Sequence, residues 1–403
     1  MNQKKLQKYT GSIEQSIQIT GSKSESNRLL ILQQLYSNLK IENISNSDDS
    51  KLMLRALASN ENEINIGHAG TTMRFLTSLL AAKEGSEVVL TGSGRMKERP
   101  IQILIDALRT LGADITCIEN EGFAPLLIKG KKLQGGKVTI DGNVSSQYIS
   151  SLLLIAPSLE KGIELEFEGA ITSVPYIEMT LSLLNSIGVT TAFEGQIIKV
   201  SPQKSIEDKT ITVESDWSSA SYYYSLIALS NSGKVTLSAY NEKSLQGDSV
   251  LASIYKEFGV ISTFEKHSLT LEKDPTYEKP KNVSFDLIKA PDIAQTIAVT
   301  CFGMGISCDL SGLHTLKIKE TDRLVALETE LGKLGADIYI TDKTLHLKAT
   351  NIIKDNIAID TYQDHRMAMA FAPLLLKTNI LINEPEVVSK SYPTFWKDFE
   401  NFQ

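Results

Sequence analysis

KETDRLVALETELGKLGADI, residues 319–338, runs from a charged segment through a helix into a strand. Leucines recur between Leu324 and Leu334 at the spacing that places them on one side of a helix, so that side faces a core. The charged segment 319–323 comes at the helix start, where free N–H groups and the helix dipole favour an anion. Gly335 suits the left-handed residue that ends many helices. We therefore expect a helix whose start binds an anion and whose end leads into a sheet.

A second copy of this pattern, RMKERPIQILIDALRTLGADI, occupies residues 95–115. Arg95, Lys97 and Arg99 precede the apolar positions of another helix, and Gly112 again precedes a strand-like run. Pro100 lies where the first turn of a helix tolerates proline. Two matching stretches predict an internal repeat.

Six polar or glycine-containing starts lead into apolar helices along the chain. They are GSKSESNRLLILQQL from Gly21, GHAGTTMRFLTSLLA from Gly67, GNVSSQYISSLLLIAP from Gly142, SDWSSASYYYSLIAL from Ser215, APDIAQTIAVTCFGM from Ala290 and YQDHRMAMAFAPLLL from Tyr362. A second, amphipathic helix follows each start, and β-rich runs bounded by glycine-containing turns lie between them. Each repeat is therefore predicted to run strand, helix, strand, helix and hairpin.

The first repeat is shorter than the others, because its second helix, near 48–58, passes directly to 64–66 with no room for the hairpin. Six repeats divide into two halves of three, which suits a chain too long for one ordinary core. We expect one domain over residues 21–213 and a second over 1–20 plus 214–403, so that the N-terminal strand joins the second. The predicted fold class is α/β, with six βαβαββ repeats, three per domain, and the first truncated.

The chain of 403 residues is 42% hydrophobic and 22% charged, as in ordinary α/β proteins. Its net charge of −7 argues against nucleic-acid binding through bulk electrostatics. Its cations nevertheless gather at helix starts, where they oppose the dipole unless an anion is bound. They predict a small anionic ligand, and without it we expect them to repel one another. These cations are Lys23, Arg28, Arg74, Arg95, Lys97, Arg99, Lys319, Arg323 and Arg366.

Cys117, Cys301 and Cys308 have neither metal-binding nor disulfide-framework spacing, which fits a reducing cytoplasm. The five histidines are scattered, and no Walker-type or dinucleotide fingerprint occurs. No apolar run reaches the length of a membrane span, and the N-terminal segment has no signal-peptide pattern. We expect a soluble, cytoplasmic protein with no metal, organic cofactor, membrane or nucleic-acid partner.

Seven motifs, taken in order, resemble the 5-enolpyruvylshikimate-3-phosphate (EPSP) synthase family, and the resemblance covers essentially the whole chain. They are GSKSESNR (21–28), AGTTMR (69–74), RMKERP (95–100), VSSQY (144–148), KETDR (319–323), DHRMAM (364–369) and SKSYPTF (389–395). The resemblance implies a two-domain inverted α/β barrel-like fold. It also implies that the helix N-termini point into an interdomain cleft that holds the active site.

The implied reaction transfers the carboxyvinyl group of phosphoenolpyruvate to the 5-hydroxyl of shikimate-3-phosphate and releases phosphate. The 5-hydroxyl adds to C2 of phosphoenolpyruvate while C3 is protonated, and the tetrahedral intermediate then expels phosphate. This is the sixth step of the shikimate route to aromatic compounds, and the implied enzyme is a monomer. It requires a base, an acid and cations for the phosphates and carboxylates, but no metal.

The family pattern also implies the substrate contacts. Shikimate-3-phosphate is expected against Lys23, Ser24, Arg28, Ser145, Ser146, Gln147, Ser173, Tyr176, Asp292 and Lys319. Phosphoenolpyruvate is expected against Lys23, Gly70, Arg99, Gln147, Arg323, Arg366 and Lys390. Gly70 lets the backbone approach the ligand closely, since a side chain there would project toward it.

Three residues are expected to move protons. Asp292 is the base for the 5-hydroxyl proton, Glu320 is the acid for C3, and Lys23 shares the proton transfer. An acid must hold its proton, so we expect a raised pKa for Glu320 in a closed, dry site. The alternative role for Asp292, which follows Pro291, is a plain helix cap.

Three other interpretations are weaker. The enolpyruvyl transferase that acts on UDP-N-acetylglucosamine shares the fold, but usually has lysine-asparagine in the first motif and often a reactive cysteine near Arg95. Here Ser24 follows Lys23, and the first cysteine is Cys117. A non-catalytic anion-binding protein on the same scaffold would lack the catalytic carboxylates, and a solenoid would have repeats stacked in one open row.

Three residues depart from the common family pattern. His68 stands where asparagine is usual, Phe75 where proline often follows the arginine, and Thr315 where a substrate-binding asparagine is common. None replaces a proposed charged catalytic group, so the expectation of activity stands.

Overall fold

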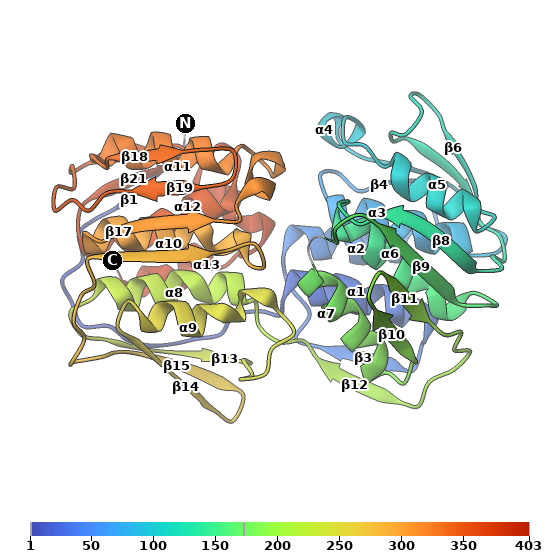
Figure 1. Ribbon diagram of the computed structural model, residues 1–403, viewed down its shortest axis with the longest axis horizontal. Coiled ribbons are helices and arrows are strands. Elements are labelled where there is room, and N and C mark those ends of the chain that lie inside the picture. The colour runs from blue at the N-terminus through green and yellow to red at the C-terminus, as the bar shows by residue number, and fades with distance from the viewer. Residues whose placement is uncertain (1, 172–173, 403) are drawn as a thin grey trace. The chain divides into compact units, whose positions relative to one another are not determined.

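The computed structural model describes residues 2–171 and 174–402, and the chain forms two compact units (Figure 1). The inserted unit is Gly21–Val213, and the split unit is Met1–Thr20 together with Glu214–Gln403. Both bounds fall where the sequence placed the change of domain. Each unit has its own hydrophobic core, as its length requires.

The sheets of the inserted unit are small and separate. Two have four strands, in which a parallel pair is followed by an antiparallel hairpin. Their orders are β4 (Glu63–Asn65), β5 (Glu87–Thr91), β7 (Leu126–Lys129), β6 (Asp114–Cys117), and β8 (Gly136–Asp141), β9 (Ile163–Glu168), β11 (Ile197–Val200), β10 (Thr191–Glu194). A third sheet pairs β3 (Leu39–Glu42) with β12 (Lys209–Thr212) in parallel.

The split unit repeats this arrangement. Its four-stranded sheets have the orders β2 (Glu14–Ile17), β13 (Lys234–Ser238), β15 (Ser268–Lys273), β14 (Val260–Glu265), and β16 (Asn282–Asp286), β17 (Ser307–Ser311), β19 (Leu345–Leu347), β18 (Ile338–Ile340). In its third sheet, β21 (Ile380–Asn383) runs parallel to β20 (Ile357–Ile359) and antiparallel to β1 (Gln3–Leu6). The N-terminal segment thus supplies two strands to this unit, whereas the sequence predicted one.

Four repeats therefore have the predicted order of strand, helix, strand, helix and hairpin, and the first lacks its hairpin as predicted. The sixth repeat was wrongly expected to be complete. After β21 the chain enters short helices, among them α13 (Phe395–Phe399), and β1 pairs with β21 where a hairpin strand would lie. The reason is that Phe399 and Phe402 pack on Tyr223 of the core instead of alternating along strands. Closure of the sheets into a barrel stays a prediction.

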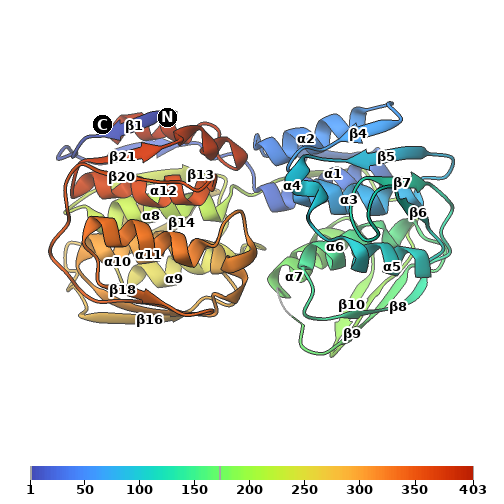
Figure 2. The same ribbon diagram turned by 90° about the horizontal axis from the view of Figure 1, so that it is seen from above.

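Three helices in each unit are buried on nearly every side, and each follows one of the six predicted starts. They are α1 (Lys23–Leu35), α3 (Gly70–Ala82), α6 (Ser146–Ile155), α8 (Trp217–Leu229), α10 (Ala294–Met304) and α12 (His365–Phe371). Because apolar residues surround these helices, all sides can be covered by protein. Within each unit, Figure 2 shows them between sheets that lie on the outside.

The remaining helices are shorter or amphipathic. The α-helices are α2 (Asp48–Ala58), α4 (Gly94–Lys97), α5 (Gln102–Thr110), α7 (Val174–Ser186), α9 (Leu251–Lys256), α11 (Arg323–Leu334) and α13. The 3₁₀ turns are Ala156–Ser158, Gly247–Val250, Pro291–Ile293, His314–Ile318, Ala372–Leu376, Pro385–Lys390 and Glu400–Phe402. None of the described helices is both long and apolar enough to cross a membrane.

The stretches 319–338 and 95–115 contain helices α11 and α5, which end as predicted. Gly335 and Gly112 have φ of +104° and +97°, the left-handed conformation that glycine adopts freely. Most of the charged residues, however, lie ahead of these helices, and only Arg323 belongs to a first turn. Asp322 caps α11, so Lys319 lies ahead of it, and α5 begins only at Gln102.

Hydroxyl groups join the central helices to one another. Ser221 of α8 bonds Thr296 of α10 at 3.0 Å, and one turn later Thr300 donates to Ser225 at 2.8 Å. In the inserted unit, Ser78 of α3 bonds Ser151 of α6 at 2.5 Å. Buried hydrogen bonds of this kind contribute about 1 kcal/mol each and fix how the helices lie along one another. They thereby fix the relative positions of the helix starts.

Candidate active site

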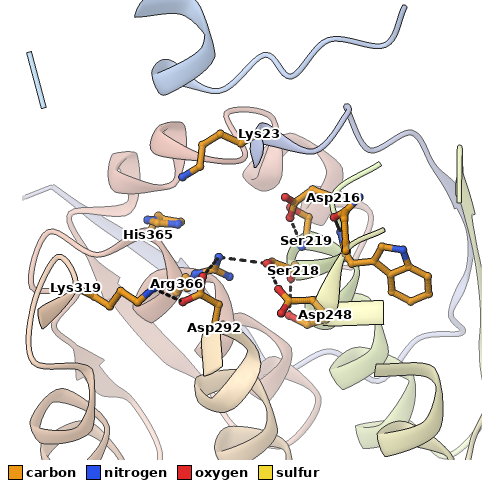
Figure 3. A network of polar contacts seen from close by, with 12 residues as sticks. Lys23, Asp216, Ser218, Ser219, Asp248, Asp292, Lys319, His365 and Arg366 are labelled. Atoms are coloured by element: carbon orange, nitrogen blue, oxygen red, sulfur yellow. Dashed lines mark hydrogen bonds and ion pairs between the residues drawn. The ribbon is translucent and has the colours of Figure 1, made fainter. Parts of the chain in front are cut away.

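In the split unit, the starts of the three central helices meet (Figure 3). Arg366, in the first turn of α12, donates from Nη2 to Asp292 Oδ2 and to Ser218 Oγ, each at 3.2 Å. Ser218 belongs to the first turn of α8, and Asp292 lies in the 3₁₀ turn that leads into α10. Asp364 caps α12 by accepting from Arg366 N at 2.9 Å. One arginine thus ties together all three helix starts.

Asp292 is surrounded by cations. Its Oδ1 lies 3.3 Å from Lys319 Nζ and 2.9 Å from Arg323 Nη1, and its Oδ2 binds Arg366. Burial by itself would raise the pKa of Asp292, but the charges of Arg366, Lys319 and Arg323 outweigh it and hold the pKa well below its usual range. The alternative role as a helix cap is wrong, because the start of α10 has no side-chain cap bond.

Arg323 is the centre of the network and is only 1% exposed. It donates from Nε to Asp364 Oδ2 at 2.6 Å, from Nη2 to Glu320 Oε2 at 2.9 Å, and from Nη1 to Asp292. Lys390 Nζ reaches the other oxygen of Glu320 at 2.6 Å. The structure therefore brings together the predicted site residues of this unit, which are Asp292, Lys319, Glu320, Arg323, Arg366 and Lys390.

The expected raised pKa of Glu320 is wrong for this structure. Burial would raise the pKa, as the sequence argument assumed, but Arg323, Lys390 and His365 lower it well below its usual range. The carboxylate is therefore ionised at neutral pH in the unliganded protein. The sequence placed Glu320 beside Arg323, but it gave no sign that Lys390 also contacts the carboxylate.

The expected repulsion among the cations is also wrong for this unit, because carboxylates accompany them. Four cations (Lys319, Arg323, Arg366 and Lys390) lie in one network with four carboxylates (Asp248, Asp292, Glu320 and Asp364). Asp248 accepts a hydrogen bond from Ser218 Oγ. Burial and the neighbouring Asp292 raise the pKa of Asp248 to about 6. The network is therefore close to neutral.

In the inserted unit, Arg28 of α1 is buried and held by its own unit. It donates to Thr180 Oγ1 at 2.7 Å, to Ser150 Oγ at 2.8 Å and to the Ser24 carbonyl at 2.8 Å. Burial lowers the pKa of Arg28 to about 10, so the group stays charged at neutral pH. Its guanidinium also stacks 5.5 Å from the ring centroid of Phe75, the residue that departs from the family pattern.

The guanidinium of Arg28 is also 5.8 Å from the ring centroid of Tyr176. Of the expected shikimate-3-phosphate contacts, Ser24, Arg28 and Tyr176 thus lie together. Ser173 lies outside the described residues.

Arg99 lies against Gly70, and both were predicted contacts of phosphoenolpyruvate. A Cβ on Gly70 would stand 2.6 Å from Arg99 Nη1, so a side chain here would displace the guanidinium from its present position. Arg99 is exposed, and its side chain has no hydrogen bond or ion pair to the residues that the structure describes. It thus differs from the paired arginines of the split unit.

The other predicted residues of the inserted unit stand at helix starts. Lys23 begins α1 and lies 3.7 Å from Asp49, a long ion pair. Ser145 caps α6, and Gln147 donates to Thr71 Oγ1 of α3 at 3.2 Å. Helix starts that carry a lysine or hydroxyl groups suit an anionic group.

The model of the family described as EPSP synthase (3-phosphoshikimate 1-carboxyvinyltransferase) matches residues 57–399. The chain belongs to this family. It is 44% identical over 391 residues to a 3-phosphoshikimate 1-carboxyvinyltransferase of Bacteroides fragilis, covering 96% of this chain and 94% of that protein. The enzyme of the same description from Mannheimia haemolytica is 35% identical, with 96% of each chain covered.

The fold of the chain is that of EPSP synthases. A solved EPSP synthase from Acinetobacter baumannii superposes with a TM-score of 0.82 at 20% sequence identity, covering 99% of this chain and 98% of that one. A two-domain α/β fold of this family was predicted from the sequence and is confirmed.

Three carboxylates of this EPSP synthase family member escaped the sequence argument. Asp364 stands in the quoted motif DHRMAM, so its place beside Arg366 was available. Asp49 lies in the first turn of α2, where acidic residues are common, and Asp248 follows a glycine in a short 3₁₀ turn. Neither of these two has a local pattern that distinguishes it from a surface carboxylate.

Proposed function

We propose that the chain transfers the carboxyvinyl group of phosphoenolpyruvate to the 5-hydroxyl of shikimate-3-phosphate and releases phosphate. The observation that carries the proposal is the cluster at the helix starts of the split unit, where Asp292 lies among Lys319, Arg323 and Arg366. A chain of the EPSP synthase family with this cluster has a base and anion-binding groups side by side. Residues of both units are among the proposed substrate contacts, as the resemblance implies.

Shikimate-3-phosphate is proposed to bind mainly to residues of the inserted unit. The free amides and hydroxyls at the starts of α1 and α6 suit its phosphate. The proposed contacts are Lys23, Ser24, Arg28, Ser145, Ser146, Gln147, Ser173 and Tyr176, with Asp292 and Lys319 at the ring hydroxyls.

Phosphoenolpyruvate is proposed to bind Arg323, Arg366 and Lys390 of the split unit, and Lys23, Gly70, Arg99 and Gln147 of the inserted unit. The Nε atom of Arg366 is buried and has no hydrogen-bond partner within the described part of the chain. A buried donor left unpaired costs about 1–3 kcal/mol. An anionic oxygen of the substrate would remove that cost, which supports placing the ligand here.

The chemistry needs two groups that transfer protons and no covalent enzyme intermediate. Asp292 accepts the proton of the 5-hydroxyl while the hydroxyl oxygen bonds to C2 of phosphoenolpyruvate. C3 receives a proton from Glu320 and becomes a methyl group. The C2–O bond to phosphate then breaks, the methyl group returns a proton to Glu320, and the leaving phosphate takes the 5-hydroxyl proton from Asp292. Lys23 is proposed to share in this proton traffic.

The lowered pKa values fit this scheme only if substrate binding changes them. Asp292 and Glu320 are both ionised in the free protein, because each is paired with arginine and lysine. Phosphoenolpyruvate brings its own negative charges to Arg323, Arg366 and Lys390. It therefore weakens their hold on the two carboxylates and raises the pKa of both. Asp292 becomes a stronger base, and Glu320 becomes able to carry a proton.

The test is phosphate release with phosphoenolpyruvate and a second substrate. We expect release with shikimate-3-phosphate and none with UDP-N-acetylglucosamine, and loss of release in Asp292→Asn. Release with UDP-N-acetylglucosamine alone would favour the related transferase. Binding of both substrates without release would favour a non-catalytic anion-binding protein.

The proposal also includes the finer expectations from the sequence, namely a cytoplasmic monomer without cofactor. Full activity after dialysis against a chelator and a monomer mass in sedimentation are expected. A loss of activity on dialysis that added metal restores would contradict the expected absence of a cofactor.

A further inference from the structure

The two residues before the motif Asp364-His365-Arg366 have an unusual backbone. Tyr362 and Gln363 have φ of +53° and +55°, in the left-handed region that residues other than glycine rarely adopt. Such a conformation persists only where the surrounding structure holds it. Since Asp364 and Arg366 follow directly, their positions depend on whatever holds this segment.

A buried carboxylate on helix α11 holds it. Glu330 is fully buried, and its Oε1 accepts a hydrogen bond from Tyr362 Oη at 2.6 Å. Its Oε2 accepts from Asp360 N at 3.1 Å and from Lys333 Nζ at 2.8 Å. Lys333 Nζ also contacts Asp360 Oδ2 at 2.6 Å. We call Glu330, Lys333, Asp360 and Tyr362 the Glu330 clamp.

The same helix holds the segment at a second point. Arg323 and Glu330 are seven residues apart, about two helical turns, so they lie on one face of α11. Arg323 binds Asp364, and Glu330 binds Tyr362. The left-handed pair lies along the chain between Asp360 of the clamp and Asp364. Helix α11 thus fixes both ends of the turn that leads to Arg366.

We propose that Glu330 and Tyr362 are positioning residues, which hold the turn at 360–364 so that Arg366 is placed to bind phosphoenolpyruvate. The inference rests on the proposed function, because it takes Arg366 as a phosphoenolpyruvate contact. Neither residue touches the Asp292 network itself. Without the clamp, the turn spends part of its time in conformations that do not place Arg366.

This role predicts a specific kinetic effect. The apparent affinity for a ligand falls in proportion to the fraction of protein in the binding-competent conformation. Loss of the clamp should therefore raise KM for phosphoenolpyruvate. Saturating phosphoenolpyruvate restores the competent conformation, so kcat should change much less.

The first test is Tyr362→Phe, which removes only the hydroxyl. Tyr362 is 36% exposed, so the variant is expected to fold. We expect KM for phosphoenolpyruvate to rise about tenfold, with kcat and KM for shikimate-3-phosphate within about threefold of wild type. Tyr339→Phe is the matched control, because Tyr339 lies in the same unit, is 52% exposed, and its hydroxyl has no partner among residues 2–171 and 174–402. It should change nothing.

Glu330→Gln is the second variant and should shift KM in the same direction, since it removes the charge that binds Lys333 and Tyr362. If Glu330→Gln prevents folding, because Glu330 is buried, the KM of Tyr362→Phe alone tests the inference. An unchanged KM for phosphoenolpyruvate in Tyr362→Phe overturns the inference. So does a fall in kcat of about tenfold without a rise in KM.

A second measurement separates this inference from the proposed function. Hydrogen exchange of the amides 364–368 in the unliganded protein should be about tenfold faster in Tyr362→Phe than in wild type, with α10 unchanged. This measurement does not depend on catalysis. Absence of phosphate release by the wild type would overturn the proposed function, whereas unchanged exchange at 364–368 would overturn the clamp.

Discussion

The helix starts of the two units differ in how their cations are balanced. In the split unit, every cation of the network is paired, and Arg323 alone binds three carboxylates. In the inserted unit, Arg99 has no partner within the described residues, and Lys23 has only a long contact with Asp49. The same repeat therefore places cations in two ways. Those of the split unit are already paired with carboxylates, whereas Arg99 of the inserted unit is unpaired among the described residues.

The difference in ion pairing predicts different roles for the cations of the two units. A paired network places Asp292 and Glu320 firmly, which suits proton transfer, since catalytic groups need fixed geometry. An unpaired arginine gains most from an incoming anion, because binding breaks no existing ion pair. We therefore expect changes in the split unit to affect turnover and stability, and changes at Arg99 to affect binding.

The largest expected effect is on turnover in Asp292→Asn. Removal of the proposed base should lower kcat by roughly 10²–10⁴-fold with both substrates saturating. Steady-state phosphate release measures this. Asp342→Asn is the control, because Asp342 belongs to the same unit but forms only an exposed pair with Lys317. A kcat of Asp292→Asn within tenfold of wild type would show that Asp292 is not the base.

The next effect is on stability in Arg323→Ala. Removing one partner of a buried ion network leaves the others uncompensated, so the free energy of unfolding should fall by about 3–5 kcal/mol. Arg99→Ala should change it by less than about 0.5 kcal/mol. Both tryptophans, Trp217 and Trp396, lie in the split unit, so their fluorescence during urea unfolding reports on this unit. Equal losses in the two variants would contradict the comparison.

The unfolding of Arg99→Ala needs a probe in its own unit, because the tryptophans do not report there. Circular dichroism follows both units together. A second transition that shifts in Arg99→Ala by as much as the tryptophan transition shifts in Arg323→Ala would show that Arg99 is also paired in solution.

Asp248 should give the split unit a distinct dependence on pH. Its folded pKa of about 6 exceeds the usual 3.8, so the folded state holds this proton more tightly than the unfolded state. The contribution of Asp248 to the free energy of unfolding is therefore largest below about pH 4 and falls as the pH rises to about 6. Asp248→Asn lacks this loss, so its stability relative to wild type should increase over that window by up to about 3 kcal/mol. A constant difference between the two proteins from acid to neutral pH would refute the raised pKa.

The smallest effect is expected at Gly70. Gly70→Ala would force Arg99 to move, because the new Cβ would lie 2.6 Å from Nη1. KM for phosphoenolpyruvate should rise about tenfold, or about 1.4 kcal/mol, with little change in kcat. Gly94→Ala is the matched control, since Gly94 also begins a helix and has open space around its Cβ position. If both variants keep the wild-type KM, Arg99 does not need its present position.

Much of the fold could be predicted, because its signals are local. The central helices follow from apolar residues after short polar starts, and the ends of α5 and α11 follow from Gly112 and Gly335. The missing hairpin of the first repeat follows from chain length. The missing hairpin of the sixth does not, because it depends on β1 pairing with β21 from the other end of the chain.

The site could be predicted as a set of residues but not as an electrostatic unit. The motifs contain Asp292, Glu320, Arg323 and Arg366, and the structure brings these together. The pair of Glu320 with Arg323 is local, but the contacts of Arg323 with Asp292 and of Lys390 with Glu320 join residues 31 and 70 positions apart. The sequence therefore showed only part of the charge that lowers the pKa of Glu320. The proposed roles of the individual residues stay predictions.

The most direct test of the account is KM for phosphoenolpyruvate in Arg99→Ala at saturating shikimate-3-phosphate, measured beside Arg366→Lys and Arg95→Ala. Arg99 belongs to the inserted unit and Arg366 to the split unit, whereas Arg95 is an exposed neighbour paired with Glu98. The account predicts a rise of at least about tenfold for Arg99→Ala and Arg366→Lys, and no change for Arg95→Ala. A KM within twofold of wild type in Arg99→Ala would contradict the claim that both units bind one phosphoenolpyruvate.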